Sequence, residues 1–248
     1  MSKPTIVIVP GAWQQSAALL DFSRKLNEAG YPTELVQVPS VGAAGNPLSG
    51  LADDVQAVRS SLREVRQSGK RALILAHSAG GVSGSMAIDG YDVIGIIYLA
   101  AFVIPKDASI LGLVGGEPLP WMDVQGTVIA NNNKGDRVFV KPEFMSHVFF
   151  NDMEPELQNK WASEMTHTSA KLFSTRCEYE PWMNGVQCGY IFCSQDNALP
   201  PQYQEQMINL LGPNVVCARL ETGHCPHLSA PDKLLQAFQS IVSKFITK

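Results

Sequence analysis

The stretch Arg71–Gly84, RALILAHSAGGVSG, decides the fold of this 248-residue chain. Its first half is an apolar run that predicts a buried strand, and its second half, from Ala79, predicts a helix. Ser78 lies on the connection between them, where a tight turn strains the serine backbone and tolerates only small neighbours such as Ala76 and Gly80. This geometry would hold a serine hydroxyl at the carboxyl edge of a sheet, beside backbone N–H groups that can bind an oxyanion.

Two interpretations of Ser78 are open from these residues alone: the N-cap of a glycine-tolerant helix and a catalytic nucleophile. The rest of the chain favours the nucleophile. Pro10-Gly11-Ala12 follows a first predicted strand upstream, and an aspartate and a histidine follow downstream. Serine, aspartate and histidine occur in this order in hydrolases whose nucleophile lies on a strand-to-helix turn.

The composition is that of a globular protein, with 45% hydrophobic and 17% charged residues. A chain of this length can bury roughly 70–75% of its unfolded surface around a single core. The formal net charge is −4, so there is no excess of basic residues to neutralise phosphates. We therefore expect neither nucleic acid nor an anionic membrane as a partner.

Targeting and cysteine patterns predict a cytoplasmic location. The first four residues, MSKP, lead directly into a β-branched run without the apolar region and cleavage site of a signal peptide. No apolar stretch reaches the roughly 18 residues of a membrane span. The five cysteines form an odd number without a CxxC pair, which favours reduced thiols over disulfides or a zinc site. We expect no metal and no organic cofactor.

Strands and helices are predicted to alternate in both halves of the chain. Apolar residues at steps of three and four between Leu51 and Val65 are typical of a helix, and Gly69 ends it. Such alternation predicts a parallel sheet with right-handed crossovers, whose active site lies beyond the carboxyl ends of the strands. The predicted strands are residues 5–9, 34–38, 71–76, 93–99, 187–193 and 215–220, and the last two predicted helices are residues 201–211 and 231–245.

The alternation is interrupted between residues 105 and 185. This segment is irregular, rich in large apolar residues and attached to the carboxyl end of a strand, so we predict that it forms a lid. The α/β core would then comprise residues 1–104 and 186–248. Most aromatic side chains of the insert are expected to form its own small core, because aromatics dominate core burial. The candidates for substrate contact are Trp13, His77, Trp121, Phe149, Trp182 and Cys225.

A serine nucleophile needs a base for its proton. His224 is the best placed of the five histidines, because it follows the last predicted strand in the turn ETGHCP. His77 adjoins the serine but points off the other side of its turn. The remaining histidines are His147 and His167 in the insert and His227 at the start of the last predicted helix.

The base in turn needs a carboxylate that orients it. Asp196 follows the predicted strand 187–193 in the sequence SQDN, and its alternative role is an Asx turn before Pro200. Asp107 is a rival, because it follows the preceding strand and a carboxylate need only reach the imidazole in space. We assign Asp196 as the acid.

Five segments resemble the α/β-hydrolase superfamily, and within it the branch of plant methylesterases and hydroxynitrile lyases. They are VPGAW (9–13), AHSAGG (76–81), YLAAFVIP (98–105), SQDNALPP (194–201) and TGHCPHLSAP (222–231). The resemblance spans nearly the whole chain and is weakest in the insert. It implies the α/β-hydrolase fold, with a mostly parallel sheet of about six strands flanked by helices. It also implies Ser78 as nucleophile, His224 as base, Asp196 as acid, and an oxyanion hole formed by the backbone N–H groups of Ala12 and Ala79.

Two positions depart from that branch. Pro10 replaces a histidine that often precedes Gly11, which removes a side chain that supports the loop. Cys225 stands where the hydroxynitrile lyases carry a lysine, which argues against cyanohydrin cleavage. A serine at position 78 also argues against epoxide hydrolases and haloalkane dehalogenases, whose nucleophile is an aspartate.

The predicted function is that of a serine hydrolase that cleaves a small or medium apolar carboxylic ester, lactone or thioester. Two alternatives stay open: a lyase or acyl-transfer catalyst of secondary metabolism on the same residues, and a non-catalytic small-molecule receptor. A fold does not specify a substrate, so the acyl group, the alcohol and the oligomeric state do not follow from the sequence.

Overall fold

Six parallel strands form the central sheet of the computed structural model, which describes residues 3–126 and 135–246. Their order across the sheet is β2-β1-β3-β4-β8-β9, and the non-consecutive neighbours mark crossover connections. The predicted α/β-hydrolase fold is thereby confirmed. The strands are β1 (Thr5–Val9), β2 (Thr33–Leu35), β3 (Ala72–His77), β4 (Val93–Leu99), β8 (Cys188–Cys193) and β9 (Val216–Leu220).

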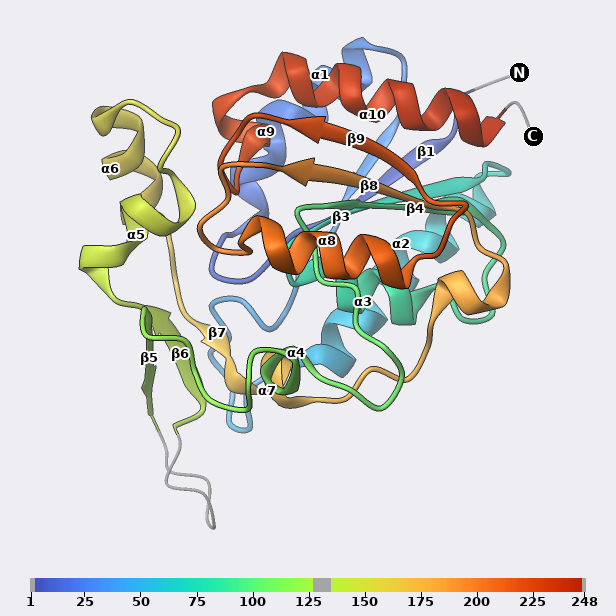
Figure 1. The fold of residues 1–248 in the computed structure, drawn as a ribbon. Helices are drawn as coiled ribbons and strands as arrows, with labels where there is room; N and C mark the ends of the chain where they lie inside the picture. The colour runs from blue at the N-terminus through green and yellow to red at the C-terminus, as the bar shows by residue number, and fades with distance from the viewer. Residues whose placement is uncertain (1–2, 127–134, 247–248) are drawn as a thin grey trace.

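Helices cover both faces of this sheet, as Figure 1 shows. Because side chains alternate along a strand, Ile6 and Ile8 pack on one face and Val7 and Val9 on the other. The first face is covered by α1 (Leu20–Glu28) and α10 (Pro231–Ile246). The second face is covered by α2 (Leu51–Gln67), α3 (Gly80–Ala87) and α8 (Pro201–Leu210).

Most element boundaries lie within one or two residues of the predicted ones. Two predictions were wrong in detail. The strand expected at residues 34–38 is only three residues long, although the backbone N–H of Val36 still donates to the carbonyl of Ile8 (3.0 Å). His227 does not begin the last helix but lies in the separate short helix α9 (Pro226–Ser229). The last helix starts at Pro231, because proline fits the first turn of a helix.

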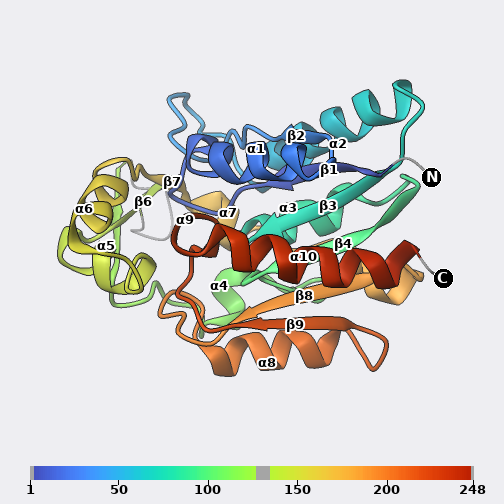
Figure 2. The ribbon, with the colours of Figure 1, turned by 90° about the horizontal axis from the view of Figure 1, so that it is seen from above.

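The insert between residues 105 and 185 contains its own antiparallel sheet of three strands, β5-β6-β7. Figures 1 and 2 show β5, β6, α5 and α6 beyond the arrowheads of β8 and β9, at the carboxyl edge of the central sheet. Residues 127–134 of this segment lie outside the described residues. Its elements are α4 (Ile110–Leu113), β5 (Met122–Gln125), β6 (Arg137–Val140), α5 (Pro142–Phe149), α6 (Pro155–Ser163), β7 (Thr168–Ser169), α7 (Ala170–Ser174) and the 3₁₀ helix η2 (Pro181–Asn184).

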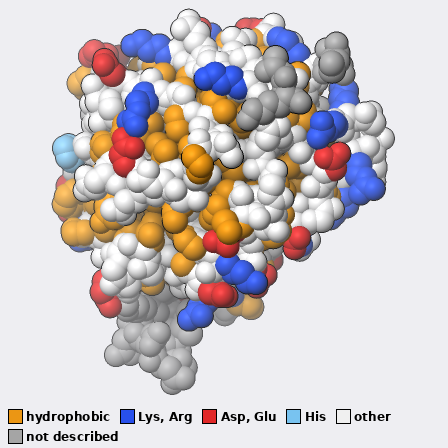
Figure 3. All heavy atoms as spheres, turned by 45° about the vertical axis from the view of Figure 1, so that its right-hand side comes forward, with side chains coloured by type: hydrophobic (Ala, Val, Ile, Leu, Met, Phe, Trp, Pro, Cys, Tyr) orange, Lys and Arg blue, Asp and Glu red, His pale blue; other side chains and the backbone are white. Residues whose placement is uncertain are grey.

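The charged side chains are mixed in sign over the surface shown in Figure 3, where basic and acidic groups are interspersed with apolar ones. This mixing agrees with the small net charge of the chain. Among the helices formed by the described residues, none combines the length and apolarity needed to cross a membrane.

Candidate active site

The turn between β3 and α3 has the strained backbone that the sequence predicts. Ser78 has φ +53°, in the left-handed region that a serine rarely adopts. Its neighbours must be small, because a Cβ on Gly80 would collide with the carbonyl oxygen of Pro10, and one on Gly81 with that of Phe102. The loops after β1 and β4 thus approach the turn from both sides and hold the serine at the carboxyl edge of the sheet.

A short hydrogen bond joins the predicted base to the predicted acid. His224 Nδ1 donates to Asp196 Oδ2 over 2.7 Å, and both side chains are buried. Since a carboxylate only accepts, the proton of a neutral His224 ring lies on Nδ1, and Nε2 is free to accept another proton. This is the tautomer that a general base for a serine requires.

The carboxylate of Asp196 is fixed by further donors. Its Oδ1 accepts the backbone N–H groups of Ala198 and Leu199, each over 2.8 Å, and Gln204 Nε2 approaches Oδ2 at 3.3 Å. The rival acid Asp107 lies elsewhere: its side chain is exposed at the start of the insert, and its backbone N–H donates to the carbonyl of Cys177. The structure therefore pairs His224 with Asp196.

The loop after β1 lies directly against the serine. A Cβ on Gly11 would be 2.6 Å from Ser78 Cβ and 3.2 Å from its Oγ. Ala12 follows Gly11 and is buried, and Ala79 lines the same pocket as Ser78. The two predicted oxyanion donors thus belong to the two segments that meet at the serine.

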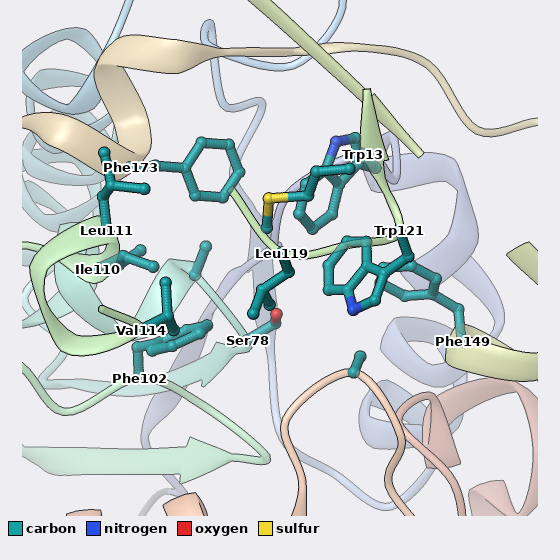
Figure 4. Close-up of a pocket in the computed structure, with 13 residues that line it drawn as sticks. Trp13, Ser78, Phe102, Ile110, Leu111, Val114, Leu119, Trp121, Phe149 and Phe173 are labelled. Carbon is teal, nitrogen blue, oxygen red and sulfur yellow. The ribbon is translucent and has the colours of Figure 1, made fainter. Parts of the chain in front are cut away.

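Apolar side chains from the core and the insert surround the Ser78 hydroxyl (Figure 4). Trp13 is their centre: its ring stacks on Phe173 (5.1 Å between centroids) and meets Trp121 and Phe149 edge-on. Trp13 is held by two hydrogen bonds, from its indole N–H to the carbonyl of Val138 (2.9 Å) and from its backbone N–H to a threonine of β7. Three of the substrate-contact candidates, Trp13, Trp121 and Phe149, therefore line one pocket with Ser78.

The other three substrate-contact candidates lie away from that pocket. His77 and Cys225 are buried beside the catalytic turns: His77 Nε2 donates to the carbonyl of His224 (2.9 Å), and the Cys225 sulfur accepts from Gln14 Nε2 (3.3 Å). Trp182 lines a different hollow, with Val186 and Phe245, at the amino ends of β8 and β9. Trp182 was misplaced because η2 leads straight into the amino end of β8, opposite the edge that carries Ser78.

Two residues that the sequence analysis missed join the insert to the catalytic loops. Asn151 Nδ2 donates to the carbonyl of Gln195 (2.8 Å), next to Asp196. Asp152 Oδ2 accepts from the backbone N–H of Gly223 (2.7 Å), next to His224, and from a serine of α9. The dipeptide Asn-Asp is ordinary loop composition, so nothing in the sequence distinguishes it from a turn.

A third missed feature is a buried histidine cluster. The ring of His77 lies 4.7 Å from that of His224 and 4.9 Å from that of His227, measured between centroids. Both ring nitrogens of His227 are buried without a hydrogen-bond partner in the described part of the chain. Burial, and to a smaller extent His224, lowers the pKa of His227 to about 3, and burial also lowers the pKa of His77.

Acid is expected to destabilise the protein through His227. In the unfolded chain its pKa is about 6.5, so the unfolded state binds more protons as the pH falls below that value. The stabilisation is fully present above pH 6.5, and at pH 5 the loss is about 2 kcal/mol in the free energy of unfolding. Urea denaturation of the wild type and of His227→Leu between pH 7.5 and pH 5 measures it.

The comparison between the two proteins isolates His227 from other groups. Burial raises the pKa of Asp54 to about 6. Because its buried carboxylate is neutralised as the pH falls, Asp54 raises the free energy of unfolding in acid, which is opposite to the effect of His227. His227→Leu should flatten the pH dependence of the free energy of unfolding. Equal slopes in the wild type and His227→Leu would refute the assignment.

Comparison with protein families gives a match over most of the chain. A family model described as "Alpha/beta hydrolase family" matches residues 6–237. The match includes all but the first residue of β1, the turn at Ser78 and the loops that carry Asp196 and His224.

Individual proteins are similar over nearly their whole length. "Alpha/beta hydrolase nvfD" of Aspergillus novofumigatus is 25% identical, with 99% of each chain covered, and "Methylesterase 7" of Arabidopsis thaliana is 25% identical, with 96% of this chain and 94% of that protein covered. Among solved structures, a "Pyrethroid Hydrolase from Sphingobium faniae JZ-2" has a TM-score of 0.79 at 21% identity, with 97% of each chain covered.

Proposed function

The chain belongs to the alpha/beta hydrolase family, and we propose that it is a serine hydrolase that cleaves a small or medium apolar carboxylic ester, lactone or thioester. One observation carries the most weight. Ser78 lines an apolar pocket on a strained turn, and the residue before it bonds to the backbone of His224, whose ring donates to a buried Asp196. A nucleophile, a correctly protonated base and an orienting acid are the groups that acyl transfer to serine requires.

In the proposed reaction, Ser78 Oγ attacks the acyl carbon while His224 Nε2 accepts the hydroxyl proton. The carbonyl oxygen becomes an oxyanion that the backbone N–H groups of Ala12 and Ala79 bind. When the carbonyl re-forms, the bond to the alkoxide or thiolate breaks, and His224 gives that group the proton. A water molecule then attacks the acyl carbon while the same nitrogen accepts its proton, and the acid leaves when the bond to Ser78 Oγ breaks and Oγ takes that proton back from Nε2. None of these steps uses a metal or an organic cofactor.

The apolar lining of the pocket supports an apolar substrate, and the contacts of the insert with the core support its role as a lid. Trp121 and Phe149 come from residues 105–185 and contact Trp13 of the core, which comprises residues 1–104 and 186–248. Apolar walls with few polar groups are typical of sites for small organic ligands. Two of the similar proteins are a methylesterase and a hydrolase by name. The five cysteines are free thiols, which supports a reducing, cytoplasmic location.

Cysteine chemistry is disfavoured although a thiol adjoins the base. Cys225 is fully buried, and burial raises its pKa well above the usual value, so the neutral thiol predominates at neutral pH. A thiol is a much weaker nucleophile than a thiolate. We therefore assign the nucleophile to Ser78 and a packing role to Cys225.

A fluorophosphonate probe is expected to label the wild type at Ser78, located by mass spectrometry of the labelled peptide, and the same protein should hydrolyse p-nitrophenyl acetate. Cys225→Ser is the control and should be labelled and active to within a few-fold. Labelling without turnover of any ester, lactone or thioester would contradict hydrolysis and favour the lyase or acyl-transfer alternative. Slow stoichiometric binding without turnover would instead indicate a receptor.

A further inference from the structure

The pocket at Ser78 is too small for the medium-sized substrates among those proposed above. We call it the inner chamber; its lining includes Ser78, Ala79, Trp121 and Phe149. Its cavity volume is about 30 Å³. A single water needs about 10–15 Å³ on this measure, and pockets for small organic ligands run to roughly 300–1,000 Å³. The inner chamber thus has room for the reacting ester group but not for an apolar chain attached to it.

A larger hollow adjoins the inner chamber. We call it the outer chamber; it lies among α4, β5, β6 and α7, and its volume is about 290 Å³. Its apolar walls include Val124, Val138 and Ala170. Three side chains, Leu111, Met122 and Phe173, line both chambers, so the two cavities are separated by one layer of apolar side chains.

We propose that the two chambers form one substrate site, in which the outer chamber binds the apolar acyl chain of an ester whose carbonyl carbon lies at Ser78. This proposal rests on the proposed function and names its substrate class: esters of medium-chain or similarly elongated apolar acids. The combined cavity reaches the lower end of the size range of ligand pockets, whereas the inner chamber alone does not.

The position of the base assigns the outer chamber to the acyl group rather than to the alcohol. The leaving group receives its proton from His224, and the ring of Phe149 lies 5.6 Å from the His224 ring. Figure 4 shows Phe149 and Phe173 on opposite sides of the Ser78 hydroxyl. The leaving group therefore departs on the Phe149 side, and the acyl chain extends on the Phe173 side toward the outer chamber.

Met122 is the side chain that can open the layer between the chambers. Phe173 is stacked on Trp13, which is itself held by hydrogen bonds from its indole and backbone N–H groups. Met122 is unbranched and has three rotatable bonds, so it adapts to irregular contacts at low cost. An acyl chain can thus displace the thioether without moving the aromatic side chains.

Ala170→Phe tests the proposal by filling the outer chamber from α7. With p-nitrophenyl esters of acetic, butyric and octanoic acid, kcat/KM for octanoate should fall by roughly 10- to 100-fold, while that for acetate stays within about twofold. Ala52→Phe, the same exchange on an exposed position of α2, is the matched control and should change neither. An equal loss on acetate and octanoate overturns the proposal.

Met122→Ala tests the layer between the chambers by removing bulk from it. This variant also keeps the proposal testable if Ala170→Phe fails to fold. It should raise the ratio of kcat/KM for octanoate to that for acetate, whereas Trp182→Ala, in the same insert but outside both chambers, should not change the ratio.

A series of acetate esters with longer alcohols should be insensitive to Ala170→Phe; a loss that follows alcohol length overturns the acyl assignment. Labelling of Ser78 and acetate turnover test the proposed function separately, so its failure is distinguishable from an error about the outer chamber.

Discussion

Replacing Ser78 with alanine is expected to lower kcat by roughly 10⁴- to 10⁶-fold on any ester that the wild-type protein hydrolyses. Alanine removes the oxygen that is proposed to attack the acyl carbon and leaves the backbone of the turn in place. His224→Ala should cost about as much, and the double variant no more than either single one, because nucleophile and base act as a unit. Steady-state kinetics give kcat, and KM should change little because the apolar pocket remains.

Ser83→Ala is the matched control for this prediction. Ser83 is also buried in the segment after β3, and its hydroxyl donates to the carbonyl of Gly80 (3.3 Å), yet no step of the proposed reaction uses it. Its loss should leave kcat within a few-fold of the wild type. Should Ser78→Ala keep more than a few per cent of the wild-type kcat, the nucleophile has been assigned to the wrong residue.

Asp196→Asn is expected to lower kcat by roughly 10³- to 10⁴-fold while the protein stays folded. Two backbone N–H groups, of Ala198 and Leu199, bind Oδ1 and will hold the asparagine oxygen at the same place. The asparagine NH₂ group then faces His224 Nδ1 and donates to it, so the ring proton moves to Nε2. A protonated Nε2 cannot accept the proton of Ser78, which is why an exchange of nearly equal size is so costly.

Asp107→Asn is the control for the acid, because it makes the same exchange at the rival position. Asp107 has φ +68°, a left-handed conformation that asparagine also tolerates, and its side chain is exposed. We expect full activity and an unchanged unfolding midpoint in urea. An active Asp196→Asn beside an inactive Asp107→Asn would show that the orienting acid is the wrong one.

The elements of the core could be predicted because local patterns specify them. The β-branched run Thr5–Val9 is buried along its whole length, and the apolar positions of Leu51–Val65 face the core, as their periodicity requires. The elements of the insert were harder to predict from the sequence. The strands β5, β6 and β7 are only four, four and two residues long, so they are too short for alternation or a long apolar run to mark them in the sequence.

The placement of the aromatic side chains shows the same limit. Trp121 and Trp182 are both tryptophans of the insert, and both were predicted to contact substrate. Trp121 lies in the pocket with Ser78, and Trp182 lies at the opposite edge of the sheet. Their local sequences do not distinguish these positions, because the position of each depends on how the insert folds back on the core.

The sequence by itself determined which residues follow which strands, and therefore that Ser78, Asp196 and His224 would lie at the same edge of the sheet, because the carboxyl ends of parallel strands lie at one edge. The glycines at positions 80 and 81 identified the turn in the sequence, because the backbone of Pro10 and that of Phe102 lie too close to allow a Cβ at these positions. Only the tertiary structure decided what surrounds these residues. The contacts of Asn151 and Asp152 with the catalytic loops, the cluster of His77, His224 and His227, and the chambers on either side of Met122 join segments far apart in the chain. Such contacts depend on packing between elements, and no periodicity within a single element encodes them.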